Sequence, residues 1–169
     1  MLNDPIVQEV LIDITHEEDA IIPIIECILN GITSDLDIAV ETNTDLKIVR
    51  KVLYNLNDAG VVTYKRSKDP ESPGDIYDWK FIQEKVFEII SSKYDKIYEE
   101  IEKSIKYEEE NMFFICKNGH RYKFEKASEI NFRCLKCGNS LDYQDNSTII
   151  LELLKEKDAC APMRKLKTK

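Results

Sequence analysis

Apolar residues recur at helical spacing through most of the first 60 residues. Residues 18–29 form the most apolar segment, and residues 44–59 place apolar side chains three and four positions apart on one face. Two shorter segments that begin at Asp4 and Ser34 follow the same period. Because proline is tolerated in a helix only near its first turn, Pro23 leads us to expect regular helix from about Ile21. The pattern therefore predicts four helices.

After residue 60 the period changes from helical to alternating. Residues 61–66 and 76–81 are rich in β-branched and aromatic side chains, and the nine residues between them contain two prolines and one glycine. This arrangement predicts an antiparallel hairpin with a long loop. Helices followed by such a hairpin are the element order of a winged helix-turn-helix domain.

A long charged helix is predicted next, over residues 83–107. Its apolar positions form one narrow stripe with spacings of three and four, close to those of a coiled coil. Two interpretations are open: the stripe packs on neighbours within the chain, or it binds a partner such as a second subunit. The stripe consists of Val86, Ile90, Tyr94, Ile97, Ile101 and Ile105.

Three of the five cysteines fall within residues 116–137 and have the spacing of metal ligands. Cys134 and Cys137 form a CxxC pair, which can grip one ion with two thiolates. The matching pair is irregular, because Gly119 stands where a second cysteine would follow Cys116, and His120 comes one position later. Since imidazole is an ordinary zinc ligand, we predict one structural Cys₃His zinc site.

Two other interpretations of this segment are open. His120 could be a surface residue, which would leave a weak site with three ligands. A catalytic zinc would instead need a general base near an open position, and nothing in the sequence orients Glu125 or Glu129 toward one. A closed structural site also fits the small size of the segment, since about 32 residues bury too little surface to fold without metal.

Together these patterns predict an α+β protein in four parts. We expect an N-terminal winged helix-turn-helix domain over residues 1–81 and a helical, coiled-coil-like connector over residues 82–111. A C-terminal zinc ribbon would occupy residues 112–143, and a tail would follow over residues 144–169.

Charge narrows the choice of partners. The 169 residues carry a net charge of −8, and residues 1–44 contain ten acidic residues but no lysine or arginine. Phosphate neutralisation provides most non-specific affinity for DNA, so we expect poor binding to bare duplex DNA. The acidic end favours a basic protein partner.

Composition excludes several other classes. No apolar run is long enough for a membrane span, and residues 1–10 lack the basic start of a signal peptide, so we expect a cytoplasmic protein without a membrane partner. The odd, uneven cysteines do not fit a disulfide framework. Because the sequence shows no nucleophile–base pair and no glycine-rich phosphate loop, we expect no enzymatic activity.

Several passages resemble one known family, that of archaeal transcription factor E, the homologue of the large subunit of the eukaryotic general factor TFIIE. They are residues 48–56 leading into 59–66, the hairpin residues 77–79 and the cysteine-rich segment 114–141. The resemblance covers about residues 5–143. The departure from the family pattern is the Gly119–His120 pair, which concerns the identity of the ligands and leaves the architecture unchanged.

The resemblance implies a general transcription initiation factor. Such factors bind the clamp of RNA polymerase, act together with the TATA-binding protein and a TFIIB-like factor, and help to open promoter DNA and stabilise the open complex. They meet DNA mainly as the melted strand within that complex. Carried to this sequence, the residues near the non-template strand or the clamp would be Lys65, Arg66, Lys68, Tyr77 and Trp79.

Two alternatives remain beside that reading. Tyr77 and Trp79 could pack on the core instead of reaching a partner, because alternation places them on one face of the hairpin. The whole chain could also be a sequence-specific winged-helix repressor that dimerises through the connector and senses zinc. The nearly neutral fourth helix and the acidic first 44 residues count against the repressor.

Overall fold

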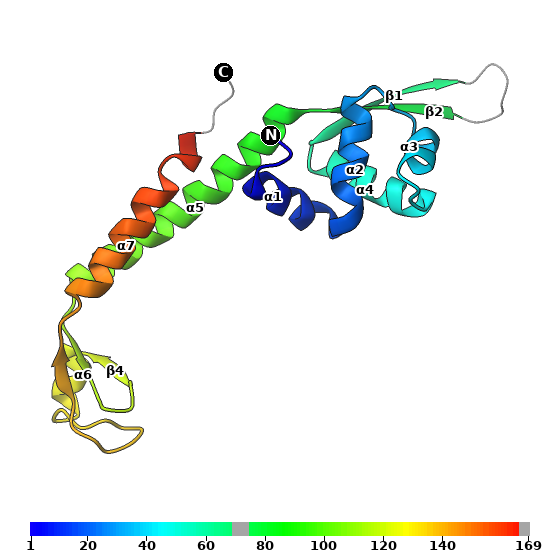
Figure 1. Ribbon diagram of the computed structural model, residues 1–169. Helices are drawn as coiled ribbons and strands as arrows, with labels where there is room; N and C mark the ends of the chain where they lie inside the picture. Colours follow the sequence, from blue (N-terminus) through cyan, green and yellow to red (C-terminus); the bar gives the residue numbers. More distant parts are fainter. Residues whose placement is uncertain (69–74, 166–169) are drawn as a thin grey trace. The chain divides into compact units, whose positions relative to one another are not determined.

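The computed structural model describes residues 1–68 and 75–165, which form helices and two small antiparallel sheets (Figure 1). This is the mixed α+β composition that the sequence predicts. Packing divides the described chain into an N-terminal unit, residues 1–92, and a C-terminal unit, residues 93–165. The predicted loop residues 69–74 and the chain end 166–169 lie outside the described residues.

Four helices come first, as the apolar period predicts. Asp4 caps the first helix by accepting a hydrogen bond from the Ile6 amide at 2.9 Å, and Asp45 caps the fourth through the Lys47 amide at 2.7 Å. Their inward faces share one core. The helices are α1 (Pro5–Thr15), α2 (Glu18–Leu29), α3 (Asp35–Glu41) and α4 (Leu46–Asp58). The fully buried core side chains include Leu11, Ile21, Ile24, Ile25, Ile38, Val49, Val52, Leu53 and Leu56.

Helix α2 tolerates a proline well inside its length. It begins at Glu18, so the expected start near Ile21 is wrong, and Pro23 occupies its sixth position. An interior proline removes one backbone hydrogen bond and crowds the carbonyl four residues earlier. Complete burial of neighbours such as Ile24 and Ile25 offsets this local penalty, since tertiary packing provides most of the stability of a helix in a protein.

The predicted hairpin closes one side of this core. Its strands β1 (Val62–Lys68) and β2 (Asp75–Phe81) pair antiparallel along their whole length. The Trp79 amide also donates a hydrogen bond to the Thr33 carbonyl at 3.0 Å, so the loop before α3 lies along the other edge of β2. Alternation along β2 turns Trp79 and Phe81 into the core.

The long helix predicted after the hairpin is present as α5 (Gln83–Glu109), which runs from one unit into the other. Its first turns pack in the N-terminal unit, where Val86 and Ile90 are fully buried. Its later turns belong to the C-terminal unit, where Ile101 and Ile105 are buried. Different parts of one apolar stripe are therefore covered by different neighbours.

Beside the later turns of α5, the C-terminal unit contains a three-stranded sheet and three further helical segments among the described residues. The central strand β3 lies between β4 and β5, and α6 follows β4 directly. The elements are β3 (Phe113–Ile115), β4 (Arg121–Lys123), α6 (Phe124–Glu129), β5 (Asp142–Gln144), α7 (Ser147–Cys160) and a 3₁₀ turn η1 (Met163–Lys165).

The tail expected over residues 144–169 contains a helix, α7, which runs beside the later turns of α5 (Figure 1). Lys157 Nζ lies 2.9 Å from a Glu102 carboxylate oxygen, and Arg164 Nε lies 2.6 Å from Asp95. Both cations also lie over the Tyr98 ring, at 5.0 and 3.8 Å from its centre. In this unit α7 therefore packs on α5, as expected if the apolar stripe of α5 packs on neighbours within the chain.

Candidate metal centre and candidate interface

Two tight turns present the predicted metal ligands. In the first, Cys116 follows β3 and His120 precedes β4. Gly119 between them has a φ of +79°, a left-handed conformation that favours glycine, and its N–H donates to the Cys116 carbonyl at 2.9 Å. This turn brings the thiol and the imidazole to the same side of the chain.

The second turn carries the CxxC pair. Cys134 and Cys137 are followed by Gly138, which has a φ of +70° and whose N–H donates to the Cys134 carbonyl at 2.8 Å. Glycine in the left-handed region allows the chain to fold back directly after the second thiol.

The structure brings all four predicted ligands together. Their ligand atoms lie within 4.8 Å of one another. His120 Nδ1 is 3.4 Å from the sulfurs of Cys116 and Cys134, and the sulfurs of Cys116 and Cys137 are 3.6 Å apart. A tetrahedral ion with metal–sulfur bonds of about 2.3 Å and a metal–nitrogen bond of about 2.0 Å has ligand–ligand edges of roughly 3.4–3.8 Å. The cluster therefore fits one four-coordinate metal ion.

Local electrostatics favour a thiolate at one of these sulfurs. Burial opposes ionisation of Cys134, but the Tyr122 hydroxyl and the amides of Lys136 and Cys137 hydrogen-bond its sulfur and lower its pKa to about 6. The Asn139 amide favours the Cys137 thiolate, whereas burial and the neighbouring thiols outweigh it and raise the pKa of Cys137. Like charges this close resist joint ionisation, so full deprotonation of the set calls for a bound cation.

A small hydrophobic cluster supports the ligands from behind. Ala127 of α6 and Leu141 before β5 are buried with Cys116 and Cys134. Phe132, half-buried, packs against the same cluster. These contacts support the two turns that carry the candidate ligands. We call residues 112–143 the metal module.

The carboxylates considered for a catalytic role stay outside the ligand set. Glu125 and Glu129 lie on α6, both exposed, and Glu129 forms an ion pair with Lys126 at 2.9 Å. Four ligands are the number that a tetrahedral zinc site takes, so an ion bound by all four candidate residues would have no open position.

The five predicted contact residues of the hairpin divide between its two faces. Arg66, Lys68, Tyr77 and Trp79 occupy one face by register, and Lys65 occupies the other. Lys65 and Lys68 are exposed, whereas Arg66 forms an ion pair with Asp75 across the hairpin. The structure therefore does not bring the five together as one patch.

Trp79 is only 2% exposed, so its ring lies in the core in this structure. Its Nε1 has no hydrogen-bond partner among the described residues. Three tyrosines surround it: the rings of Tyr64, Tyr54 and Tyr77 lie 5.0, 5.9 and 6.5 Å away, centre to centre. Tyr54 and Tyr64 are 48% and 41% exposed, and sequence reasoning did not select them. Alternation along β1 is the signal that would have identified Tyr64.

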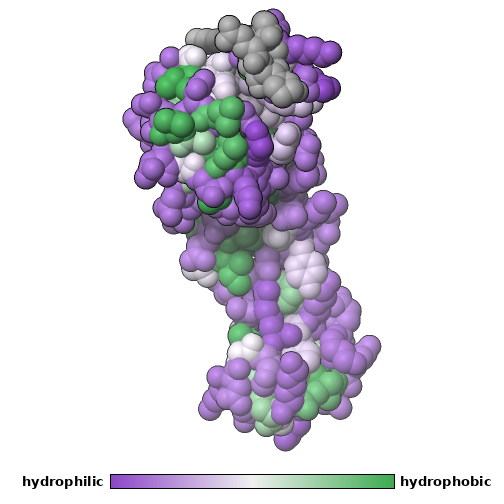
Figure 2. All heavy atoms as spheres, turned by 90° about the vertical axis from the view of Figure 1, so that its right-hand side faces the viewer, coloured by the Kyte–Doolittle hydropathy of each residue, from purple (hydrophilic) through white to green (hydrophobic). Residues whose placement is uncertain are grey.

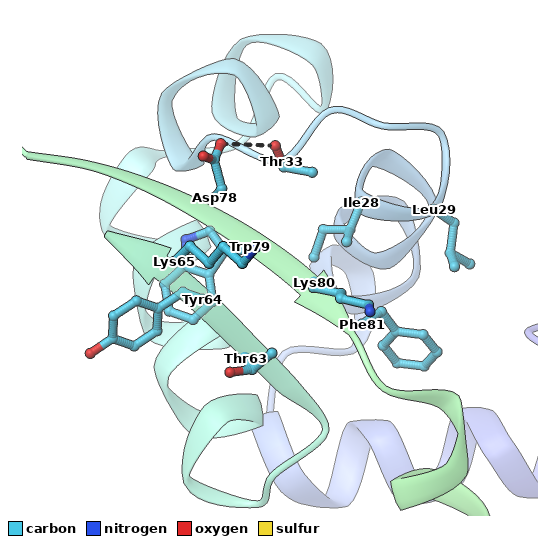
Figure 3. Close-up of a pocket in the computed structure, with 10 residues that line it drawn as sticks. All are labelled: Ile28, Leu29, Thr33, Thr63, Tyr64, Lys65, Asp78, Trp79, Lys80 and Phe81. Carbon is cyan, nitrogen blue, oxygen red and sulfur yellow. Dashed lines mark hydrogen bonds between the residues drawn. The ribbon is translucent and has the colours of Figure 1, made fainter. Parts of the chain in front are cut away.

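An open pocket of about 460 Å³ lies between the hairpin and the end of α2 and is lined from both faces of the hairpin (Figure 3). Ile28 and Leu29 at the end of α2 form one wall, and Lys65 contributes from β1. At the upper end in Figure 3, Thr33 Oγ1 donates to a carboxylate oxygen of Asp78 at 3.2 Å. The lining is mostly apolar, and Lys65 adds a positive charge.

Two of the three basic residues of α4, Arg50 and Lys51, are paired with acids of the same unit. The half-exposed side chain of Arg50 places its Nε 2.6 Å from a carboxylate oxygen of Asp35, the buried first residue of α3. This hydrogen bond raises the pKa of Arg50. Lys51 Nζ lies 2.7 Å from Glu17. Both cations are already neutralised, so α4 offers little free charge to DNA phosphates.

Helix α3 instead presents apolar side chains to solvent. Leu36 and Val40 are 56% and 82% exposed and lie one turn apart. Figure 2 views the molecule from the side on which α3 lies and shows hydrophobic patches among hydrophilic side chains there. Exposed aliphatic groups within an acidic segment are better suited to a protein surface than to a phosphate backbone.

Residues 5–110 match the model of the family described as the TFIIE alpha subunit. The chain belongs to this family. Its relatives include proteins named transcription factor E from Methanosphaera stadtmanae, 39% identical over 94% of this chain and 88% of the relative, and Methanocaldococcus jannaschii, 40% identical over 90% of each. The relative from Methanobrevibacter smithii is 39% identical over 90% of this chain and 88% of its own.

This TFIIE alpha family member is a basal transcription factor with a general role in initiation. The alignment with the Methanosphaera relative spans 158 residues, so the similarity extends beyond residues 5–143, the stretch on which the resemblance was first based. Among the described residues, no helix is long and apolar enough to cross a membrane.

Proposed function

We propose that this protein binds RNA polymerase and helps to open promoter DNA and to stabilise the open complex. The observation that carries the proposal is its similarity to archaeal proteins named transcription factor E over about nine tenths of each chain. Work of this kind needs binding surfaces and no catalytic group, so the proposal includes no enzymatic activity. It also places the protein in the archaeal cytoplasm, where promoter DNA lies.

The proposed division of labour follows the predicted parts. Residues 1–81 serve as a winged helix-turn-helix domain, residues 82–111 as a helical connector, and residues 112–143 as a zinc ribbon, followed by the tail. Four helices and a hairpin in that order support the first assignment, and ligand turns at the ends of short strands support the third.

We assign one structural zinc ion to Cys116, His120, Cys134 and Cys137. Zinc accepts thiolate and imidazole ligands in a tetrahedron, and the ligand spacing described above fits that geometry. Bound there, the ion would neutralise the crowded thiolates and hold the two turns of the metal module together. With four protein ligands no position remains for a substrate or an activated water, which favours a structural role.

The partners of the proposal are the polymerase clamp, the TATA-binding protein and a TFIIB-like factor, with promoter DNA met as the melted strand. The proposed contacts on the hairpin are Lys65, Arg66, Lys68 and Tyr77, with Trp79 supporting the tyrosine rings from the core. In this scheme a second subunit would bind the connector only where α7 leaves α5 uncovered.

Charge favours this scheme over the alternative of a sequence-specific repressor. A repressor needs free cations on α4 to meet phosphates and bases, and Arg50 and Lys51 are already paired with carboxylates. Residues 1–44 add ten acidic residues and no basic ones. A factor recruited by polymerase needs no such cations.

A gel-shift titration on two targets tests the proposal. One target is naked promoter duplex, and the other is the same promoter already bound by archaeal polymerase, TATA-binding protein and the TFIIB-like factor. We expect a supershift or a longer-lived complex only on the second target. Tight, sequence-dependent binding to the naked duplex, together with a dimer by light scattering, would replace this proposal with the repressor.

A further inference from the structure

An ion pair between a buried carboxylate and a partly exposed guanidinium joins three segments at the base of the metal module. Glu108 lies in the last turn of α5 and is only 7% exposed. Its carboxylate accepts two hydrogen bonds from the Arg121 guanidinium of β4, at 2.8 and 2.6 Å. Asn146, directly before α7, donates its Nδ2 to the Glu108 carbonyl at 2.8 Å and to its carboxylate at 2.9 Å. One residue thus ties α5 to β4 and to the start of α7.

Arg121 is held on its remaining sides as well. Its Nε donates to the Gln144 side-chain oxygen of β5 at 2.7 Å. Its guanidinium carbon lies 3.5 Å from the centre of the Phe113 ring of β3. A planar fork that pairs with a carboxylate and also stacks on an aromatic ring is specific to arginine, because lysine offers only a point charge. All three strands of the sheet therefore contact this junction.

The junction fixes the relative orientation of the segments it joins more than it adds to the free energy of unfolding. A buried ion pair loses in desolvation much of what it gains in attraction, and apolar residues of similar volume often stabilise a protein equally well. A bidentate pair with further hydrogen bonds, however, fixes direction as well as distance. Two of the strands that contact the junction also lead to candidate ligands. Cys116 directly follows β3, and His120 directly precedes β4.

We propose that Glu108, Arg121 and Asn146 are positioning residues that hold the metal module at one fixed angle on the α5–α7 helix pair, so that both bind the transcription machinery as one rigid body. The geometric part of this inference rests on the junction alone. The functional part rests on the proposed action through polymerase.

The test uses the full zinc-loaded chain and four variants. Glu108→Ala removes the central carboxylate, Glu108→Gln keeps its shape and one acceptor, and Arg121→Lys keeps the charge without the fork. The matched control is Glu110→Ala, which removes the exposed ion pair with Lys106, at 3.7 Å, at the end of the same helix. Zinc content and helical circular dichroism establish that each variant is folded.

The structural readout is ¹⁵N relaxation of backbone amides. In the natural protein and in Glu110→Ala, amides of the metal module and of α7 should share one rotational correlation time. In Glu108→Ala the module's correlation time should shorten while its zinc content stays at one per chain. Glu108→Gln and Arg121→Lys should fall between these limits.

Two results would overturn the positioning role. One is an unchanged correlation time in Glu108→Ala, and the other is loss of zinc or of helix, which would make the junction part of the fold itself. The functional readout is polymerase-dependent stabilisation of the open complex, expected to drop several-fold in Glu108→Ala and to stay unchanged in Glu110→Ala. If the natural protein gives no stabilisation, the proposed function fails while the relaxation result still stands.

Discussion

Four of the five cysteine side chains of this protein occupy two different environments. Cys116, Cys134 and Cys137 meet at the candidate metal centre. Cys27 is buried on α2, where burial and the nearby carboxylates of Glu41 and Glu26 raise the pKa of its thiol. Because a thiol reacts as the thiolate, the chemistry of these sulfurs is set by their surroundings more than by their number.

Replacing Cys134 or Cys137 with serine should release the metal and unfold the metal module alone. A serine hydroxyl is a poor zinc ligand at neutral pH, so we expect metal affinity to fall by more than about 100-fold. The measurement is zinc per chain by elemental analysis together with the amide dispersion of residues 112–143.

Cys27→Ser serves as the matched control, because it changes a cysteine that lies outside the ligand set. It should keep one zinc per chain. A dispersed module spectrum in metal-free Cys134→Ser would show that the fold of residues 112–143 does not depend on metal.

Acid should weaken the C-terminal unit through Glu108. The Arg121 guanidinium beside it holds the pKa of this carboxyl below its ordinary value of 4.5. A depressed pKa in the folded state adds stability that is complete above about pH 5 and is lost as pH falls through the folded value. The stability difference between the natural protein and Glu108→Gln, from urea unfolding, should therefore be constant above pH 5 and shrink below pH 4.5.

Metal release at low pH affects both of these proteins equally, so it cancels in the comparison. A difference that grew as the pH fell would contradict the assigned direction of the Glu108 pKa.

Spacing in the sequence was enough to select four candidate ligands that the fold brings together, but not to decide how other residues are used. Cys116, His120, Cys134 and Cys137 follow from local chelate geometry, which spacing reports directly. The burial of Trp79 depends on α4 and on the loop before α3, both distant in sequence. The Glu108–Arg121 pair joins residues in different elements, and no local pattern predicts such a pair.

At the scale of elements, the hairpin is the part whose two faces differ most. One face packs an aromatic cluster on the core, whereas the opposite face carries Lys65. Arg66 stands on the same face as the aromatic cluster. A partner that contacts both residues must reach around the edge of the strand.

Reversing the charge of both Lys65 and Arg66 to glutamate should weaken stabilisation of the open complex several-fold. The hairpin would then place carboxylates against a clamp surface or a nucleic-acid strand that binds cations in the proposed complex, and like charges would repel. The measurement is the lifetime of the heparin-challenged open complex with and without the variant.

Lys155→Glu is the control, since this lysine lies exposed on α7. The single variants separate the two faces: Arg66 is partly neutralised by Asp75, so Lys65→Glu should have the larger effect. Equal lifetimes for the double variant and the natural protein would move the contact to another surface.

Helices and strands were predicted correctly where one face of the element is buried against a single core. The helices before residue 60 and the two hairpin strands have such faces, and period alone reveals them. Helix α7 was missed because it has no fully buried residue, although Ile149, Ile150 and Leu153 repeat at helical spacing. The start of α2 was misjudged because tertiary packing outweighed the local penalty of Pro23.

At the scale of the whole molecule, the two units differ in what stabilises them. The N-terminal unit has a continuous apolar core. The metal module has one small cluster of four buried residues, two of which are candidate ligands. Small modules of this kind depend on metal for folding, whereas a unit with its own core does not.

Removing zinc with a chelator should therefore unfold residues 112–143 and leave the N-terminal unit folded. We expect amide signals of the module to collapse toward random-coil positions and to recover on adding one equivalent of zinc. Signals from α1 to α4 should not move. Unfolding of both units in one step would instead indicate that α5 couples them cooperatively.

The buried position of Trp79 also gives this protein a built-in optical reporter. It is the only tryptophan in the sequence, and it lies in the N-terminal unit among three tyrosines that can pass excitation energy to it. Its emission should be blue in the folded protein and shift to the red only when that unit opens. Tryptophan fluorescence would thus report on the N-terminal unit alone, because the C-terminal unit contains no tryptophan.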